Sequence, residues 1–161
     1  MLHIQALTGS HDRANFDCGN PTLNEWLQSI AGQHQQKGVS KTFVAVLDEA
    51  PTAILGYYAL TVCEVRTVEL PKAASKRLPR ATPGIRLGRL AVDASTQGQG
   101  LGKLVLLNAI NRSNKVSAEI GVHALFVDAI DENAAAFYRK YGFIPFPDQP
   151  LKLFLSLDQL R

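Results

Sequence analysis

Residues 85–119 predict a β-strand, a glycine turn and an α-helix in direct succession. We expect the strand over Ile85–Val92, the turn within Gln97–Gly102 and the helix from Gly100 to about Glu119. An apolar run at Leu125–Ala129 predicts a second strand, which completes a β-α-β unit. The glycine turn leaves backbone N–H groups at the helix start without helical acceptors, and the helix dipole adds positive charge there. The turn therefore suits a phosphate or pyrophosphate.

Two common nucleotide-binding motifs do not fit the spacing of this turn. A P-loop needs glycine where Gln97 stands and serine or threonine where Leu104 stands. A dinucleotide fingerprint that starts at Gly98 needs a small residue where Lys103 stands. The remaining pattern, Gln-x-x-Gly-x-Gly over residues 97–102, resembles the acyl-coenzyme A pyrophosphate loop of the GNAT acetyltransferase superfamily. Taken alone, the hexapeptide also fits an ordinary glycine-rich connection.

A second stretch resembles the same superfamily. Residues 131–143 run from Asp131 through Asn133, Phe137 and Tyr138 to Gly142 and Phe143, and they are similar to the second GNAT signature helix. Two such motifs in the right order, separated by a helix and a strand, indicate the superfamily much more strongly than either motif alone.

The resemblance implies transfer of an acetyl group from acetyl-CoA to an amine. This reaction needs a neutral amine, a polarised carbonyl and a leaving thiolate that is protonated or stabilised. Tyr138 matches the family tyrosine that donates a proton or a hydrogen bond to the departing sulfur. A phenol has a pKa near ~10 and a thiol near ~8.5, so the tyrosine stays protonated at neutral pH. Tyr141 is the less favoured candidate, and packing beside Phe137 is the structural alternative for Tyr138.

The resemblance also implies where acetyl-CoA binds. The end of the first strand offers backbone groups to the pantetheine amides, as an added strand would; these residues are Leu90, Ala91 and Val92. The pyrophosphate is held by the turn and the helix start, which are Gln97, Gly98, Gln99, Gly100, Leu101, Gly102 and Lys103. Asn133 matches the family residue near the pantetheine arm.

Further elements surround this unit. Asn20 caps an amphipathic helix that begins at Pro21 and ends at Gln36. A hairpin, a last helix stopped by Gly142 and two closing strands are expected over Thr42–Leu47 with Ile54–Val62, Glu132–Tyr141, Phe143–Phe146 and Lys152–Leu157. Pro71, Pro79 and Pro83 keep the segment between the hairpin and the β-α-β unit irregular. We expect one α/β domain over residues 1–161, of the mixed α+β type, with the GNAT acyl-CoA N-acyltransferase fold: a central mixed, mostly antiparallel sheet with helices on both faces.

Composition narrows the class of protein. The 161 residues are 46% hydrophobic and 19% charged, which suits one folded domain. No apolar run reaches the roughly 18 residues that span a bilayer, and the N-terminus lacks a leader pattern, so we expect a cytoplasmic protein with no membrane role. Cys18 and Cys63 are expected to be reduced. The four histidines show no metal-like spacing, and we expect no metal site.

The most basic stretch adjoins the first strand of the unit. Lys72, Lys76, Arg77 and Arg80 lie there without an acidic residue between them, and Arg86 and Arg89 follow on the strand. The net charge of +3 permits a polyanionic partner without requiring one. A solvated loop is the simpler interpretation of this stretch.

A narrower resemblance gives the stretch a function. Residues 16–27, together with Arg89–Asp93, the glycine turn and Leu153–Leu155, are similar to the GNAT toxins of bacterial toxin–antitoxin pairs. This resemblance implies acetylation of the α-amine on aminoacyl-tRNA, a block of translation, a homodimer and an antitoxin with a ribbon-helix-helix part. The basic residues Lys72, Lys76, Arg77, Arg80, Arg86 and Arg89 are then candidates for tRNA phosphate contacts.

The acceptor amine and two other functions stay open. Asp93, at the loop edge, is expected to be a capping or surface residue, so no general base is identified. An α-amine with a pKa of about 7.7–8.0 is already partly neutral, whereas a lysine near ~10.4 would need a base. The alternatives are acetylation of a small-molecule amine or a protein N-terminus, and a non-catalytic module that binds acetyl-CoA or a partner.

Overall fold

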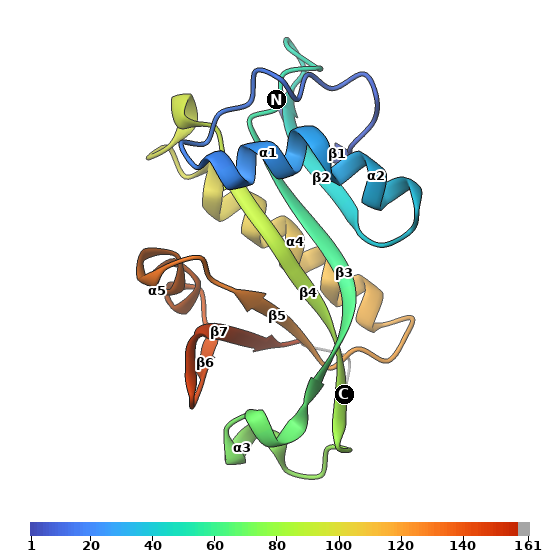
Figure 1. Cartoon of the computed structure of the whole chain (residues 1–161), viewed down its shortest axis with the longest axis vertical. Coiled ribbons are helices and arrows are strands. Elements are labelled where there is room, and N and C mark those ends of the chain that lie inside the picture. Colours follow the sequence, from blue (N-terminus) through green and yellow to red (C-terminus); the bar gives the residue numbers. More distant parts are fainter. Residues whose placement is uncertain (158–161) are drawn as a thin grey trace. The chain divides into compact units, whose positions relative to one another are not determined.

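The computed structural model describes residues 1–157 of the chain. In this part of the chain, seven strands are hydrogen bonded in the order β1-β2-β3-β4-β5-β7-β6 (Figure 1). Their bounds are β1 Leu2–Ala6, β2 Lys41–Leu47, β3 Gly56–Arg66, β4 Ala81–Val92, β5 Ala124–Asp128, β6 Ile144–Phe146 and β7 Gln149–Ser156. β4 and β5 are parallel, while β1 with β2, β2 with β3, β5 with β7 and β6 with β7 are antiparallel. The predicted β-α-β unit and the mixed, mostly antiparallel sheet are confirmed.

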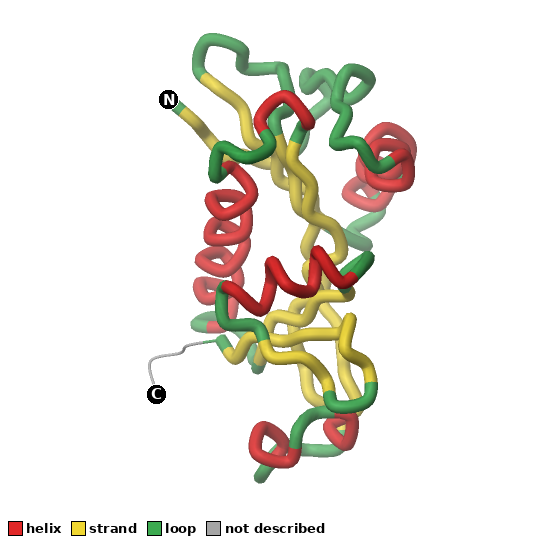
Figure 2. The backbone as a smooth tube through the Cα atoms, turned by 90° about the vertical axis from the view of Figure 1, so that its left-hand side faces the viewer, coloured by secondary structure: helices red, strands yellow, loops and turns green. Residues whose placement is uncertain are grey.

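Five α-helices and two short 3-10 helices connect the described strands. The α-helices are α1 Pro21–Ser29, α2 Ala31–Gln36, α3 Lys72–Ser75, α4 Leu101–Ser117 and α5 Glu132–Lys140, and the 3-10 helices are η1 Thr67–Glu69 and η2 Ala94–Thr96. Figure 2 follows the same course from another side. The backbone divides into two compact units, one of residues 1–61 with 88–109 and one of residues 62–87 with the residues from 110 onward.

In the first unit, helices cover both faces of the sheet. Val44, Val46 and Tyr57 pack with Trp26 and Leu27 of α1 in one buried cluster. Side chains alternate along a strand, so the residues next to Tyr57 face the other way. On that side, Tyr58 Oη donates a hydrogen bond of 2.5 Å to Asn108 Oδ1 of α4. A Cβ at Gly56 would lie 3.4 Å from Val105 Cγ2, so α4 packs closely there.

The second unit has its own aromatic core. Phe126, Phe146 and Phe154 pack with Val65 and Leu70. A Cβ at Gly84 of β4 would lie 2.3 Å from Phe126 Cε2, so only glycine fits at that position. This close approach fixes how β4 and β5 meet.

The prediction of one helix over residues 20–36 is wrong in one respect, because the structure has two consecutive helices there. Asn20 caps α1 as predicted, and its side chain accepts a hydrogen bond of 3.2 Å from Leu23 N. The break falls at Ile30, whose φ is −117° and whose side chain is 36% exposed. Ser29 and Gly32 flank the break, and both residue types weaken a helix.

The prediction of an irregular segment before β4 is also wrong. β4 begins at Ala81, four residues before the predicted Ile85, and includes Pro83, while Lys72–Ser75 form the short helix α3. Pro83 fits because its carbonyl accepts a hydrogen bond of 2.8 Å from His123 N and the ladder with β5 begins only at Gly84. The sequence did not predict β1, whose five residues alternate between partly buried and exposed.

Candidate active site

The glycine turn has the geometry of an anion cradle. Gly98 and Gly100 both have φ of +81°, which glycine adopts without strain. Leu104 N donates to Gly100 O at 3.3 Å, so the first turn of α4 starts at Gly100. In the described chain, no protein acceptor receives a hydrogen bond from the backbone N–H groups of residues 98–103. These groups, together with the positive end of a 17-residue helix, favour a bound anion.

The side-chain amide of Gln97 forms hydrogen bonds within the protein and supports the turn. Its Nε2 donates hydrogen bonds to Cys18 O at 2.9 Å and to Val92 O at 3.0 Å. These two contacts fasten the start of the turn to the end of β4 and to the segment before α1. The side chain of Gln97 therefore positions the turn, and its backbone N–H donates to Ala94 O at 3.4 Å, so the free N–H groups of the turn begin at Gly98.

Asp93 caps the connection, as the sequence indicated. Its carboxylate accepts hydrogen bonds from Asp17 N at 3.0 Å, Ser95 N at 3.1 Å and Ser95 Oγ at 2.6 Å. Partial burial raises the pKa of Asp93, but these hydrogen bonds outweigh it and hold the pKa below its usual value. A carboxylate this well satisfied is a poor proton acceptor at neutral pH.

Leu90, Ala91 and Val92 lie beyond the part of β4 that pairs with β5. The parallel ladder joins Gly84–Leu87 to Ala124–Val127 and does not include later residues of β4. Ala91 is buried at 5% exposure, whereas Leu90 and Val92 are partly exposed. The strand thus continues past its β5 partner at the residues predicted to pair with pantetheine.

Tyr138 is a buried phenol on α5. It is 6% exposed and lies edge-on to Phe137 and Phe143, with ring centroids 5.4 Å apart in each pair. Within the described residues, its hydroxyl has no hydrogen-bond acceptor. Burial raises the pKa of Tyr138 above its ordinary value, so the group is a proton donor throughout the neutral range. Asn133 is exposed in the first turn of the same helix.

The predicted tRNA-binding cations occupy different settings. Lys72, Lys76, Arg77 and Arg80 are exposed on one segment, which Thr67 N closes by donating to Arg80 O at 2.9 Å. Arg86 is paired with Asp128 at 2.9 Å, and the Arg89 guanidinium lies 4.7 Å from the centre of the Trp26 ring. Arg86 and Arg89 project from alternate sides of β4. The sequence could not predict their partners, which are distant along the chain.

The described residues hold no group of three or more metal-ligating side chains. None of their helices is long and apolar enough to cross a membrane.

Known proteins are similar to this chain along nearly all of its length. The family profile described as "Acetyltransferase (GNAT) domain" matches residues 38–145. A "tRNA-acetylating toxin" of Mycobacterium tuberculosis (strain ATCC 25618 / H37Rv) is 34% identical over 96% of this chain and 92% of its own. The structure of "AtaT complexed with acetyl-methionyl-tRNAfMet" is 33% identical, with a TM-score of 0.90 over 97% of this chain and 95% of that one.

A second solved structure contains AtaT with two ligands. It is a mutant AtaT toxin "bound to the C-terminus of the antitoxin AtaR and Acetyl-CoA", 31% identical, with a TM-score of 0.82 over 97% of this chain and 93% of that one. The profile match spans more than half of the chain, and the fold agrees. The chain belongs to the GNAT acetyltransferase family.

Proposed function

We propose that this protein transfers the acetyl group of acetyl-CoA to the α-amino group of aminoacyl-tRNA and blocks translation as the toxin of a toxin–antitoxin pair. The observation that carries the acetyl-CoA part is the row of free backbone N–H groups at residues 98–103. The tRNA part is supported by the relative named as a tRNA-acetylating toxin and by the exposed cations of residues 72–80.

The roles of the residues follow from their surroundings. The turn amides neutralise the pyrophosphate, and Leu90, Ala91 and Val92 offer their backbone to the pantetheine amides. The neutral α-amine attacks the thioester carbonyl, forming the C–N bond as the C–S bond breaks. Tyr138 gives its proton to the departing thiolate and regains one from solvent, which also takes the excess amine proton. An α-amine has a pKa of about 7.7–8.0, so the reaction needs no dedicated base.

The same proposal includes the binding partners and the cellular location of the protein. Lys72, Lys76, Arg77 and Arg80 contact tRNA phosphates. Arg86 and Arg89 also contact these phosphates once they leave Asp128 and Trp26. The protein acts as a homodimer in the cytoplasm and is neutralised by an antitoxin with a ribbon-helix-helix part. An antitoxin complex of the AtaT toxin supports the antitoxin assignment.

Single-turnover transfer of labelled acetyl-CoA to charged tRNA tests the reaction and the acid together. Tyr138→Phe keeps the ring packing and removes no protein hydrogen bond, so it should fold and lose about 10²- to 10⁴-fold in rate. Tyr141→Phe is the matched control and should keep its rate. Full activity of Tyr138→Phe would remove the acid from the mechanism. Label on free amines or peptide N-termini but not on tRNA would contradict the proposed substrate.

A further inference from the structure

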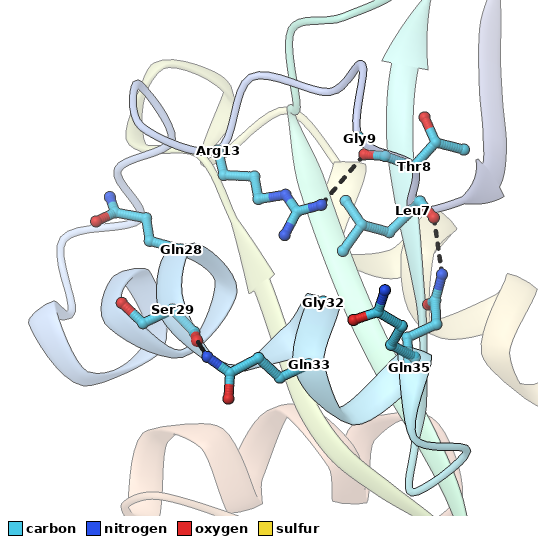
Figure 3. Close-up of a pocket in the computed structure, with 10 residues that line it drawn as sticks. Leu7, Thr8, Gly9, Arg13, Gln28, Ser29, Gly32, Gln33 and Gln35 are labelled. Carbon is cyan, nitrogen blue, oxygen red and sulfur yellow. Dashed lines mark hydrogen bonds between the residues drawn. The ribbon is translucent and has the colours of Figure 1, made fainter.

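A polar cavity of about 540 Å³ lies within the first unit (Figure 3). It is formed by the loop after β1 and by the consecutive helices α1 and α2. None of the residues assigned to acetyl-CoA or tRNA lines it. The residues that line it include Arg13, Gln28, Ser29, Gln33 and Gln36, together with Thr8 and Gly9. No carboxylate is among its lining residues.

Arg13 brings an uncompensated positive charge to this cavity. The only hydrogen bond of its guanidinium in the described chain is a long one of 3.3 Å, from Nη2 to Thr8 O. No described carboxylate forms an ion pair with it. The nearest acidic residue in sequence, Asp12, instead accepts hydrogen bonds from Asn15. Within the described chain, the guanidinium therefore uses only one of its five N–H donors.

Gly32 lies directly next to the guanidinium of Arg13 and leaves room for it. A Cβ at Gly32 would lie 2.6 Å from Arg13 Nη1, so any larger residue would push the guanidinium aside. Glycine inside a helix costs about 1 kcal/mol relative to alanine. At position 32 it leaves the space over the helix that the Arg13 guanidinium occupies.

Neutral amide groups surround this charge. Gln33 Nε2 donates to Ser29 O at 3.0 Å, which leaves Gln33 Oε1 free to accept a hydrogen bond. The side-chain amides of Gln28 and Gln36 have no hydrogen-bond partner within the described chain. Burial and the charge of Arg13 lower the pKa of nearby His11 below its ordinary value, although a hydrogen bond with the Thr8 backbone opposes the shift. The cavity thus offers one cation and several amide donors and acceptors.

This combination matches a peptide that carries a carboxylate. Arginine binds carboxylates through two parallel hydrogen bonds, and glutamine amides pair with peptide N–H and C=O groups. A nucleic acid strand would need several cations in a row, and this cavity has one. We propose that the cavity binds an extended acidic peptide, with Arg13 holding a Glu or Asp side chain. This site is independent of acetyl transfer.

Two-dimensional NMR with short probe peptides tests the proposal on the full chain. The probes are acetyl-Gly-Glu-Gly-amide and its neutral counterpart acetyl-Gly-Gln-Gly-amide. The acidic probe should shift the side-chain amide signals of Gln28, Gln33 and Gln36 and the backbone signal of Gly9. The neutral probe should bind at least about tenfold more weakly, the factor set by one charge-assisted contact.

Variants separate binding by Arg13 from a structural role. Arg13→Gln should abolish the response to the acidic probe, and Lys37→Gln, which removes a charge from an exposed residue just after α2, should keep it. Gly32→Ala retains every charge and improves the helix, yet should weaken binding by displacing the guanidinium. Equal binding of both probes, an unaffected Arg13→Gln variant, or tighter binding of inorganic phosphate than of the acidic probe would overturn the proposal.

Discussion

Tyr57 and Tyr138 are both buried, but only one of them has a protein acceptor. Tyr57 Oη donates to Leu23 O at 2.7 Å, and the residue is fully buried. The Tyr138 hydroxyl has no acceptor in the described chain. Since this hydroxyl is not one of the fully enclosed polar atoms without a partner, its oxygen touches solvent and is available to a ligand. The contrast supports a structural role for Tyr57 and a chemical role for Tyr138.

Tyr57 also predicts how stability depends on pH. Burial, and to a smaller extent the nearby Cys18, raises the pKa of Tyr57 above its ordinary 10.0. Below pH 10 both the folded and the unfolded chain keep this proton, so the group adds no pH dependence. Above pH 10 the unfolded chain loses the proton while the folded chain keeps it, and the free energy of unfolding falls as pH rises.

Urea unfolding at pH 9, 10 and 11 measures this effect. Between pH 10 and 11, the parent should lose up to about 1.4 kcal/mol more than Tyr57→Phe, which cannot titrate there. At pH 9 the variant should be less stable by about 1 kcal/mol, because Leu23 O loses its donor. Parallel stability curves above pH 10 would contradict the raised pKa.

The connection from β4 to α4 depends on backbone conformation more than on side chains. Gln97 and Asp93 hold its first half by hydrogen bonds to backbone groups, and the second half needs two left-handed residues, Gly98 and Gly100. An alanine in that conformation is strained by roughly 1–2 kcal/mol. The strain is relieved by turning the backbone, which would redirect the N–H groups.

Gly98→Ala and Gly100→Ala should therefore weaken coenzyme A binding about tenfold each, measured by calorimetry. The matched control is Gly121→Ala, because Gly121 has no positive φ and no neighbour within 4 Å of an added Cβ. The control should keep both its affinity and its melting temperature. Unchanged affinity in both turn variants would exclude the turn from the cofactor site.

The two compact units are joined through regular elements and not through linkers. Their boundaries fall inside β3, β4 and α4, between residues 61 and 62, 87 and 88, and 109 and 110. Domain boundaries normally fall in exposed linkers that few contacts cross. Opening one unit alone would require breaking the backbone hydrogen bonds of these three elements.

We expect the whole chain to unfold in one cooperative transition, as small single domains usually do. Trp26 is the only tryptophan, and it lies in the first unit, so its fluorescence reports that unit alone. Circular dichroism at 222 nm reports the helices of both units. The two urea transitions should coincide. A fluorescence transition at clearly lower urea than the dichroism transition would show that the units unfold separately.

Local patterns predicted most elements and the candidate site. Several features depend on neighbours in the sequence, such as Asn20 before Pro21: the capped start of α1, the hairpin of β2 and β3, the β-α-β unit, and the end of α5 shortly before the left-handed Gly142. Boundaries that depend on distant partners were missed. The strand β1 pairs with β2, which lies 35 or more residues further along the chain. Pro83 lies within a strand, where its carbonyl accepts a hydrogen bond from His123 N.

The sequence by itself determined the family, the glycine turn and the tyrosine on α5, because these depend on residue types at short, fixed spacings. The tertiary structure decided which side chains are already engaged: Gln97 with Cys18 and Val92, Arg86 with Asp128, and Arg89 with Trp26. It also formed the cavity beside Arg13 from segments whose sequences carry no motif. Except for the contact between Gln97 and Val92, these side-chain contacts join residues far apart in the chain, and only folding brings such residues together.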